Sequence, residues 1–178
     1  ERIGDVGVTK DLASHDIDIA AWVCGSDYRE VHALTEYQSR REHEDMVVAI
    51  GRLSSGVLVN HVVNWLSPMK ERSVTVTGEG GTFVADTLSG DLTLHENGAE
   101  TIEWESFASF RGVTEGNVTR FAFPKKEPLI SELESFREAV SGVPGSHVTF
   151  REGFAILKVA HGLLESAETG VTVSFSDA

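Results

Sequence analysis

The chain has 178 residues, of which 40% are hydrophobic, and carries a formal net charge of −13 at pH 7. A domain of this length buries about 70% of the surface that its unfolded chain exposes, so we expect a single compact domain over residues 1–178. The negative charge disfavours nucleic acid and anionic membranes as partners, because both require a basic protein surface.

Cysteine content and hydropathy bear on location. Cys24 is the single cysteine, so no intrachain disulfide can form. No stretch approaches the roughly 20 consecutive apolar residues that span a membrane. We therefore expect a cytoplasmic protein that does not associate with membranes. Because the sequence starts at Glu1 without an initiator Met, we also expect it to be part of a longer protein.

The first regular element is a predicted helix between Thr9 and Gly25. Thr9 is a suitable N-cap, and Asp11 lies in the first turn, where the helix dipole favours a carboxylate. Gly25 is suited to ending the helix because glycine readily adopts the left-handed conformation.

Four side chains of this helix form a row at 100° per residue: Asp11, His15, Asp18 and Trp22. A carboxylate one turn from an imidazole orients the ring and stabilises its charged form, while the other ring nitrogen accepts a proton from a substrate hydroxyl. Asp11 and His15 have this spacing, which predicts a catalytic pair. A solvated helix face has the same spacing, and a metal site built on Asp11 and His15 is a third interpretation.

Short β-rich runs joined by turn residues follow the helix. They are Val31–Gln38, Asp45–Leu53, Val57–Trp65, Arg72–Thr77, Thr82–Asp86, Leu92–His95 and Thr101–Trp104. Sequential short strands of this kind pair in an antiparallel manner. The glycine-rich segment at residues 78–81 lies between two of these strands, so we expect a hairpin turn there and no dinucleotide site.

The C-terminal third begins with an irregular segment, Phe107–Lys126, which we interpret as a long functional loop. Two helices are predicted next, the first from Pro128 to Gly142 and the second from a capping box at Thr149 and Glu152 to Gly170, followed by a strand at Val171–Phe175. The expected fold class is α+β, with an open, largely antiparallel β-sheet and helices packed on one face.

Candidate substrate-binding residues follow the third strand. Trp65 offers a flat face for a sugar, although an aromatic residue at a strand end also serves simple packing. Lys70 and Arg72 follow after the turn at Pro68, and Arg120 is a further candidate. With Lys125 and Lys126 these cations would concentrate positive charge in an acidic protein, or they are ordinary solvated charges.

Three motifs occur in a characteristic order. Residues 7–25 read G-V-T-K-D-L-A-S-H-D-I-D-I-A-A-W-V-C-G, residues 63–82 read V-N-W-L-S-P-M-K-E-R-S-V-T-V-T-G-E-G-G-T, and residues 127–136 read E-P-L-I-S-E-L-E-S-F. With these motifs the chain resembles the C-terminal domain of the Gfo/Idh/MocA family of NAD(P)-dependent sugar and inositol oxidoreductases.

The resemblance implies an enzyme that oxidises a hydroxyl to a ketone by hydride transfer. It aligns His15 with the family's acid/base histidine and Asp11 with its acidic partner, and it favours a sugar or sugar-nucleotide substrate. NAD or NADP would be bound mainly by an N-terminal Rossmann domain absent from this chain, and the family's catalytic lysine has no counterpart here. The isolated chain is therefore expected to be inactive.

The same resemblance implies a homo-oligomer that associates through the open face of the sheet. The alternative to an enzymatic role is accordingly a non-catalytic module whose sheet mediates assembly.

Overall fold

The computed structural model describes residues 4–98, 114–145 and 147–176. The chain divides into two compact units, one formed by Glu1–Pro68 with Ser146–Ala178 and the other by Met69–Gly145. That residues 1–178 act as a single substrate-binding and oligomerisation domain stays a prediction.

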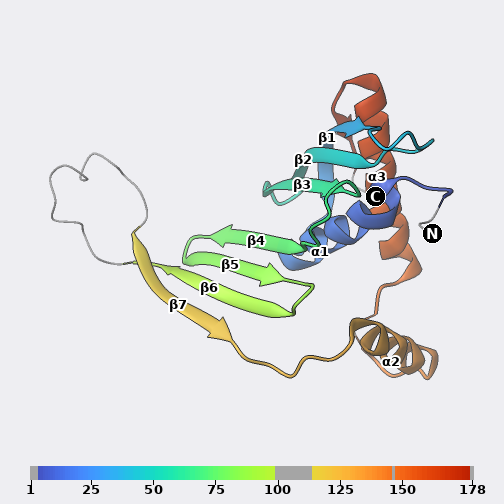
Figure 1. Cartoon of the computed structure of the whole chain (residues 1–178). Helices are drawn as coiled ribbons and strands as arrows, with labels where there is room; N and C mark the ends of the chain where they lie inside the picture. Colours follow the sequence, from blue (N-terminus) through green and yellow to red (C-terminus); the bar gives the residue numbers. More distant parts are fainter. Residues whose placement is uncertain (1–3, 99–113, 146, 177–178) are drawn as a thin grey trace, which may run out of the picture. The chain divides into compact units, whose positions relative to one another are not determined.

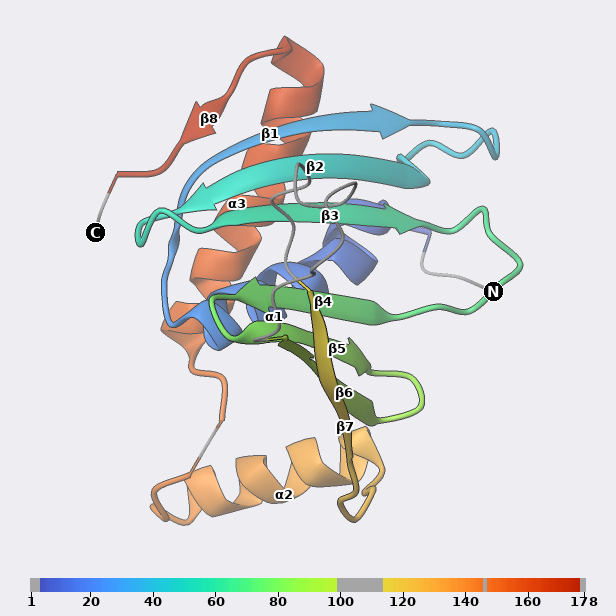
Figure 2. The same ribbon diagram turned by 90° about the vertical axis from the view of Figure 1, so that its left-hand side faces the viewer.

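The first unit contains a four-stranded antiparallel sheet in the order β3-β2-β1-β8, in which β1, β2 and β3 are labelled in Figure 1 and β8 in Figure 2. Its strands are β1 (Tyr28–Glu36), β2 (Met46–Leu53), β3 (Leu58–Asn64) and β8 (Val173–Ser174). Three helical segments of the same unit contact this sheet or each other: the π-helical segment η1 (Thr9–Ala13), α1 (Ser14–Cys24) and α3 (Phe150–Thr169).

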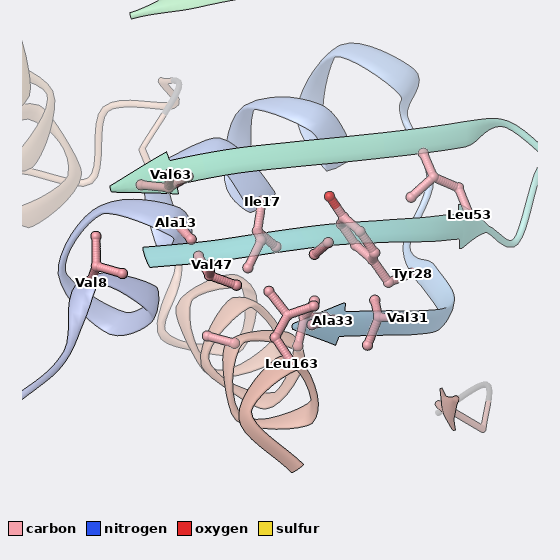
Figure 3. Close-up of a cluster of buried hydrophobic side chains, with 13 residues drawn as sticks. Val8, Ala13, Ile17, Tyr28, Val31, Ala33, Val47, Leu53, Val63 and Leu163 are labelled. Atoms are coloured by element: carbon pink, nitrogen blue, oxygen red, sulfur yellow. The ribbon is translucent and has the colours of Figure 1, made fainter. Parts of the chain in front are cut away.

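The hydrophobic core of the first unit lies between one face of the sheet and these helices (Figure 3). Alternate residues of a strand point to opposite faces of a sheet. In β2, Val47 and Ala49 are buried while Val48 and Ile50 are exposed. Ile17 of α1 and Leu163 of α3 complete the buried cluster. The helices therefore cover one face of the sheet and leave apolar side chains exposed on the other.

The second unit contains another four-stranded antiparallel sheet, in the order β4-β5-β6-β7 (Figure 2). Its elements are β4 (Ser73–Gly78), β5 (Gly81–Asp86), β6 (Asp91–Asn97), β7 (Glu115–Phe121) and α2 (Pro128–Val140). The glycine-rich segment at residues 78–81 joins β4 to β5 as the expected hairpin turn.

The expected α+β class is confirmed, with antiparallel strands, open sheets and helices on one face of the first sheet. The strands are divided between two sheets, whereas we expected one. Gly25 and Gly170 end α1 and α3 with φ values of 57° and 71°, and Thr149 and Glu152 form the predicted capping box at the start of α3.

One predicted segment, a loop, needs correction, and one predicted strand lies outside the residues that the structure describes. Residues 115–121, part of the predicted loop Phe107–Lys126, form strand β7 and pair with β6. All residues of β7 are exposed, so the strand lacks the alternation of buried and exposed positions by which sequence reveals strands. The predicted strand Thr101–Trp104 lies outside the described residues.

No helix in the described ranges is long and apolar enough to cross a membrane.

Candidate active site

The Asp11 carboxylate is held by an indole from a distant part of the sequence. The Trp65 Nε1–H donates to Asp11 Oδ2 at 3.1 Å, across 54 residues of sequence. Asp11 lies in η1 and its own backbone N–H donates to the Gly7 carbonyl. The structure thus joins the first predicted motif to the second and fixes the position of one predicted catalytic residue.

Trp65 is itself fixed by the chain on both sides. It directly follows β3, and its backbone N–H donates to the backbone carbonyl of Asp45 at 2.9 Å. The Asn64 side-chain oxygen then accepts from the N–H groups of Leu66 and Ser67, which turns the chain after the indole. Trp65 is half-buried and packs against the core. These contacts make its indole N–H a rigid donor for Asp11.

The connection between β1 and β2 folds back over Trp65. Asp45, which is fully buried, accepts hydrogen bonds from the backbone N–H groups of Gln38 and Ser39. Desolvation opposes the charged form of Asp45, but the hydrogen bonds from Ser39 and Gln38 outweigh it and hold the pKa of this carboxyl below its usual value. Arg41, in the same connection, places its guanidinium 5.3 Å from the centre of the Trp65 ring. One face of the indole is therefore occupied by a cation.

The start of η1 differs from the expected N-cap at Thr9, which was wrong. Thr9 is the first residue of η1, and its buried hydroxyl has no hydrogen-bond partner among the described residues. The Thr9 N–H donates instead to the carboxylate of the buried Glu44 at 3.0 Å. A Cβ at Gly7 would lie 2.0 Å from that carboxylate, so glycine is required to admit it. The cap comes from 35 residues away, which no local pattern reveals.

The predicted row of four side chains is also corrected. His15, Asp18 and Trp22 lie on the regular helix α1, whereas Asp11 precedes them in the π-helical segment. The wider π turn changes the angle per residue, so the 100° spacing holds only from His15 onward. Short π segments are frequent at functional sites, and this one lies at the junction between the two predicted catalytic residues.

His15 is exposed, Asp18 is half-buried and Trp22 is 76% exposed. In the described part of the chain, no hydrogen bond joins the Asp11 carboxylate to the His15 ring. Catalytic hydrogen bonds often tighten only when substrate is bound. The site therefore combines the accessible imidazole of His15 with the carboxylate of Asp11, four residues earlier, which accepts a hydrogen bond from Trp65.

The predicted basic residues lie in the second unit. Lys70 and Arg72 are exposed in the segment before β4. Arg120 of β7 pairs with Asp91 at 3.0 Å, and Lys125 pairs with the same carboxylate at 2.7 Å. Hydrogen bonds from Lys125 and then Arg120 hold the pKa of Asp91 well below its usual value. Lys126 pairs with Glu134, so three of the five predicted cations already have acidic partners.

The residues that sequence reasoning missed are Arg41, Glu44 and Asp45. All three lie in the connection between β1 and β2, where no periodicity or motif distinguishes them. Their roles become visible only when the connection is seen beside η1 and Trp65. Among the residues that the structure describes, no group of three His, Cys, Asp or Glu side chains is placed to hold a metal ion.

Comparison with known proteins finds a matching family model. Residues 2–84, just under half of the chain, match the family model described as the GFO/IDH/MocA C-terminal domain. Over these residues the chain is similar to GFO/IDH/MocA C-terminal domains. The matched range contains Asp11, His15 and Trp65, and the prediction made from the motifs is confirmed. A comparison of the sequence with curated proteins found no match.

Solved structures of GFO/IDH/MocA oxidoreductases share the fold. UDP-N-acetylglucosamine 3-dehydrogenase GnnA from Acidithiobacillus ferrooxidans is 21% identical with a TM-score of 0.77, over 93% of this chain and 50% of that one. The WlbA dehydrogenase from Bordetella pertussis, solved with NADH and UDP-GlcNAcA, is 21% identical with a TM-score of 0.67, over 98% and 46% of the two chains. An aldose-aldose oxidoreductase from Caulobacter crescentus is 17% identical with a TM-score of 0.68, over 91% and 45%. This chain thus spans about half the length of these proteins.

Proposed function

We propose that this chain is the substrate-binding and catalytic half of an NAD(P)-dependent dehydrogenase that oxidises a hydroxyl of a sugar or sugar nucleotide to a ketone. His15 accepts the hydroxyl proton, and Asp11 orients and stabilises the resulting imidazolium. A nicotinamide cofactor, when bound, would supply the acceptor for the hydride that leaves the same carbon. Alone, without the nucleotide-binding half, the chain is inactive.

The hydrogen bond from Trp65 to Asp11 is the observation that carries this proposal. A carboxylate held by a rigid donor keeps its position while a neighbouring imidazole gains a proton, so less reorganisation accompanies proton transfer. A carboxylate on an ordinary solvated helix face is hydrated by water and does not require a hydrogen bond from a half-buried indole. The anchored Asp11 and the exposed His15 fit the proton-handling half of a dehydrogenation.

The proposal assigns the cofactor to a Rossmann domain outside residues 1–178. The glycine-rich segment at residues 78–81 is a hairpin turn between β4 and β5, not the strand-to-helix turn that cradles a pyrophosphate. Support for the cofactor class comes from WlbA, which was solved with NADH.

Trp65, Lys70, Arg72 and Arg120 are proposed to contact the substrate. Lys70 and Arg72 have exposed side chains, which fits binding of a charged group. Arg120 would have to exchange Asp91 for the substrate, because the two form an ion pair at 3.0 Å. The name of GnnA and the presence of UDP-GlcNAcA in the WlbA structure favour a sugar nucleotide as the substrate class.

The test of this function uses the longer protein that carries residues 1–178. Purified protein is mixed with NAD⁺ or NADP⁺ and a panel of free sugars and sugar nucleotides, and reduced nicotinamide and keto product are both measured. We expect stoichiometric formation of the two with at least one sugar derivative. Absence of nicotinamide reduction across the panel would contradict the proposal.

A second candidate function, assembly through the first sheet, is favoured by a specific feature of its uncovered face. Leu34 of β1 is paired with Val48 of β2, which is paired in turn with Val62 of β3. These side chains are 65%, 39% and 60% exposed. A contiguous apolar row of this kind typically marks a protein interface, and we propose a second copy of the chain as its partner.

Val62→Glu tests this association. A carboxylate buried without a partner in a self-complementary interface is costly, so we expect the dissociation constant of the oligomer to rise at least about tenfold. Sedimentation velocity over a range of concentrations measures the change. Val171→Glu is the matched control, because Val171 is also exposed but lies between α3 and β8. A monomeric wild-type protein at high concentration would refute the assembly role.

A further inference from the structure

Arg41 is a cation at the candidate site, where its guanidinium lies over the ring of Trp65. Among the described residues, no carboxylate lies within ion-pair distance of its guanidinium, whereas Arg52 pairs with Glu30 and Arg120 pairs with Asp91. Arg41 is exposed, and its guanidinium lies over the ring of Trp65. An exposed arginine usually samples many rotamers, so one held against an aromatic ring has a defined position.

The backbone beside Arg41 is strained in a way that favours this position. Arg40 has a φ of 57°, and no other non-glycine residue in the described ranges has a positive φ. The left-handed conformation costs an ordinary residue about 1 kcal/mol or more. Asp45 anchors the same connection through its hydrogen bonds to the N–H groups of Gln38 and Ser39. Strain persists only where surrounding contacts hold it, and here it turns the chain directly before Arg41.

The ring that supports Arg41 is the one that positions the predicted catalytic carboxylate. The Trp65 Nε1–H donates to Asp11 at the edge of the indole, while Arg41 occupies a face of the same indole. A guanidinium that rests on a ring through its face still has its N–H edge free for hydrogen bonds. That edge matches the paired oxygens of a phosphoryl or carboxylate group.

We propose that Arg41 is a specificity-determining residue that binds an oxyanion of the substrate, so that the site takes an acidic sugar derivative in preference to a neutral sugar. This inference rests on the proposed function, because it deepens the assignment of substrate class. The oxyanion is a phosphoryl group or a sugar carboxylate, since both present the same pair of oxygens to a guanidinium.

The negative net charge of the chain makes a local cation such as Arg41 important for binding an anion. A protein with a net charge of −13 repels an anionic substrate at long range. A guanidinium that has no acidic partner among the described residues offsets this repulsion locally, and this one lies on the indole that donates to Asp11. Replacing Arg41 should therefore affect anionic ligands and leave neutral ones unchanged.

The experiment is a ligand titration of the 178-residue chain, followed by the NMR resonance of the Trp65 indole N–H, with that of Trp22 as an internal reference. The probes are UDP-N-acetylglucosamine for the phosphoryl arm, glucuronate for the carboxylate arm and N-acetylglucosamine as the neutral sugar. We expect saturable shifts of the Trp65 resonance with at least one anionic probe and none with the neutral sugar. The arm that shifts the resonance identifies the oxyanion.

Matched variants complete the test. Arg41→Gln should weaken binding of the anionic probe about tenfold or more, because a hydrogen bond to a charged group is lost. Arg41→Lys should bind with an intermediate affinity, since lysine keeps the charge but loses the planar pair of donors. Arg29→Gln removes the same charge from another exposed arginine of the first unit, in β1, and should stay within about twofold of wild type.

Three results would overturn the inference: unchanged affinity in Arg41→Gln, equal loss in Arg29→Gln, or no response of the Trp65 resonance to either anionic probe. Each leaves the proposed dehydrogenase activity intact, because nicotinamide reduction by the longer protein is measured separately and can proceed with a neutral sugar.

Discussion

Replacing His15 by alanine is expected to lower kcat of the longer protein by about a thousandfold. General acid–base catalysis by a positioned side chain contributes roughly 10²- to 10⁴-fold, and the substitution removes the imidazole that accepts the hydroxyl proton. The change in KM should be small, because a group that acts on the reacting proton contributes mainly in the transition state. Steady-state formation of reduced nicotinamide at saturating substrate measures the effect.

His161→Ala is the matched control for His15→Ala. His161 is an exposed histidine on α3, so its removal changes the composition equally without touching the candidate site. We expect its kcat to equal that of wild type. Turnover of His15→Ala at the wild-type rate would refute the acid/base role of His15 while leaving the fold and the family unaffected.

Acidification from pH 6.5 to pH 4 is expected to lower the free energy of unfolding by about 3 kcal/mol through His61 alone. His61 is buried in β3, and its Nε2 is hydrogen-bonded to the hydroxyl of the buried Tyr28 at 2.8 Å. Desolvation lowers the pKa of His61 from 6.5 to about 4, and the pKa of Tyr28 is raised, chiefly by burial. Both groups are therefore neutral in the folded protein at neutral pH.

The sign follows from proton binding in the two states. Between pH 4 and pH 6.5 the unfolded chain protonates His61 while the folded chain does not, so the stability is fully present above pH 6.5 and is lost as pH falls towards 4. Urea unfolding at a series of pH values measures this loss.

His61→Gln retains a hydrogen-bonding partner for Tyr28 without a titrating ring. The variant should therefore lack this component of the pH dependence, while His161→Gln, at an exposed position, should keep it. A His61→Gln profile parallel to that of wild type would show that other groups cause the loss.

The sequence predicted the elements whose signals are local. Gly25 and Gly170 adopt the left-handed conformation that ends a helix, and Thr149 and Glu152 cap each other within one turn. Strand β7 was missed because none of its residues is buried. Without a buried face, a strand does not require alternating apolar and polar residues. The division of the strands into two sheets depends on pairing between distant residues, which hydrophobic periodicity does not encode.

The candidate site was likewise predictable only where its sequence signals are local. Asp11 and His15 were recognised from a motif, but the partner that anchors Asp11 lies 54 residues away. Arg41 and Glu44 act through contacts across the fold, on Trp65 and on the start of η1. Their sequence context shows only a polar connection between two strands. The π-helical segment was likewise hidden, because Glu44 and Gly7 shape the start of that helix from outside its own pattern.

The central claim is that Asp11 and His15 act as one catalytic unit, and a double-mutant cycle on kcat/KM tests it most directly. Asp11→Asn keeps an acceptor for the Trp65 indole but removes the charge that stabilises the imidazolium. If the two residues work together, the loss in the Asp11→Asn, His15→Ala double variant should lie within about twofold of the loss in His15→Ala alone. Losses that multiply in the double variant would show that the two side chains act independently, and would contradict the claim.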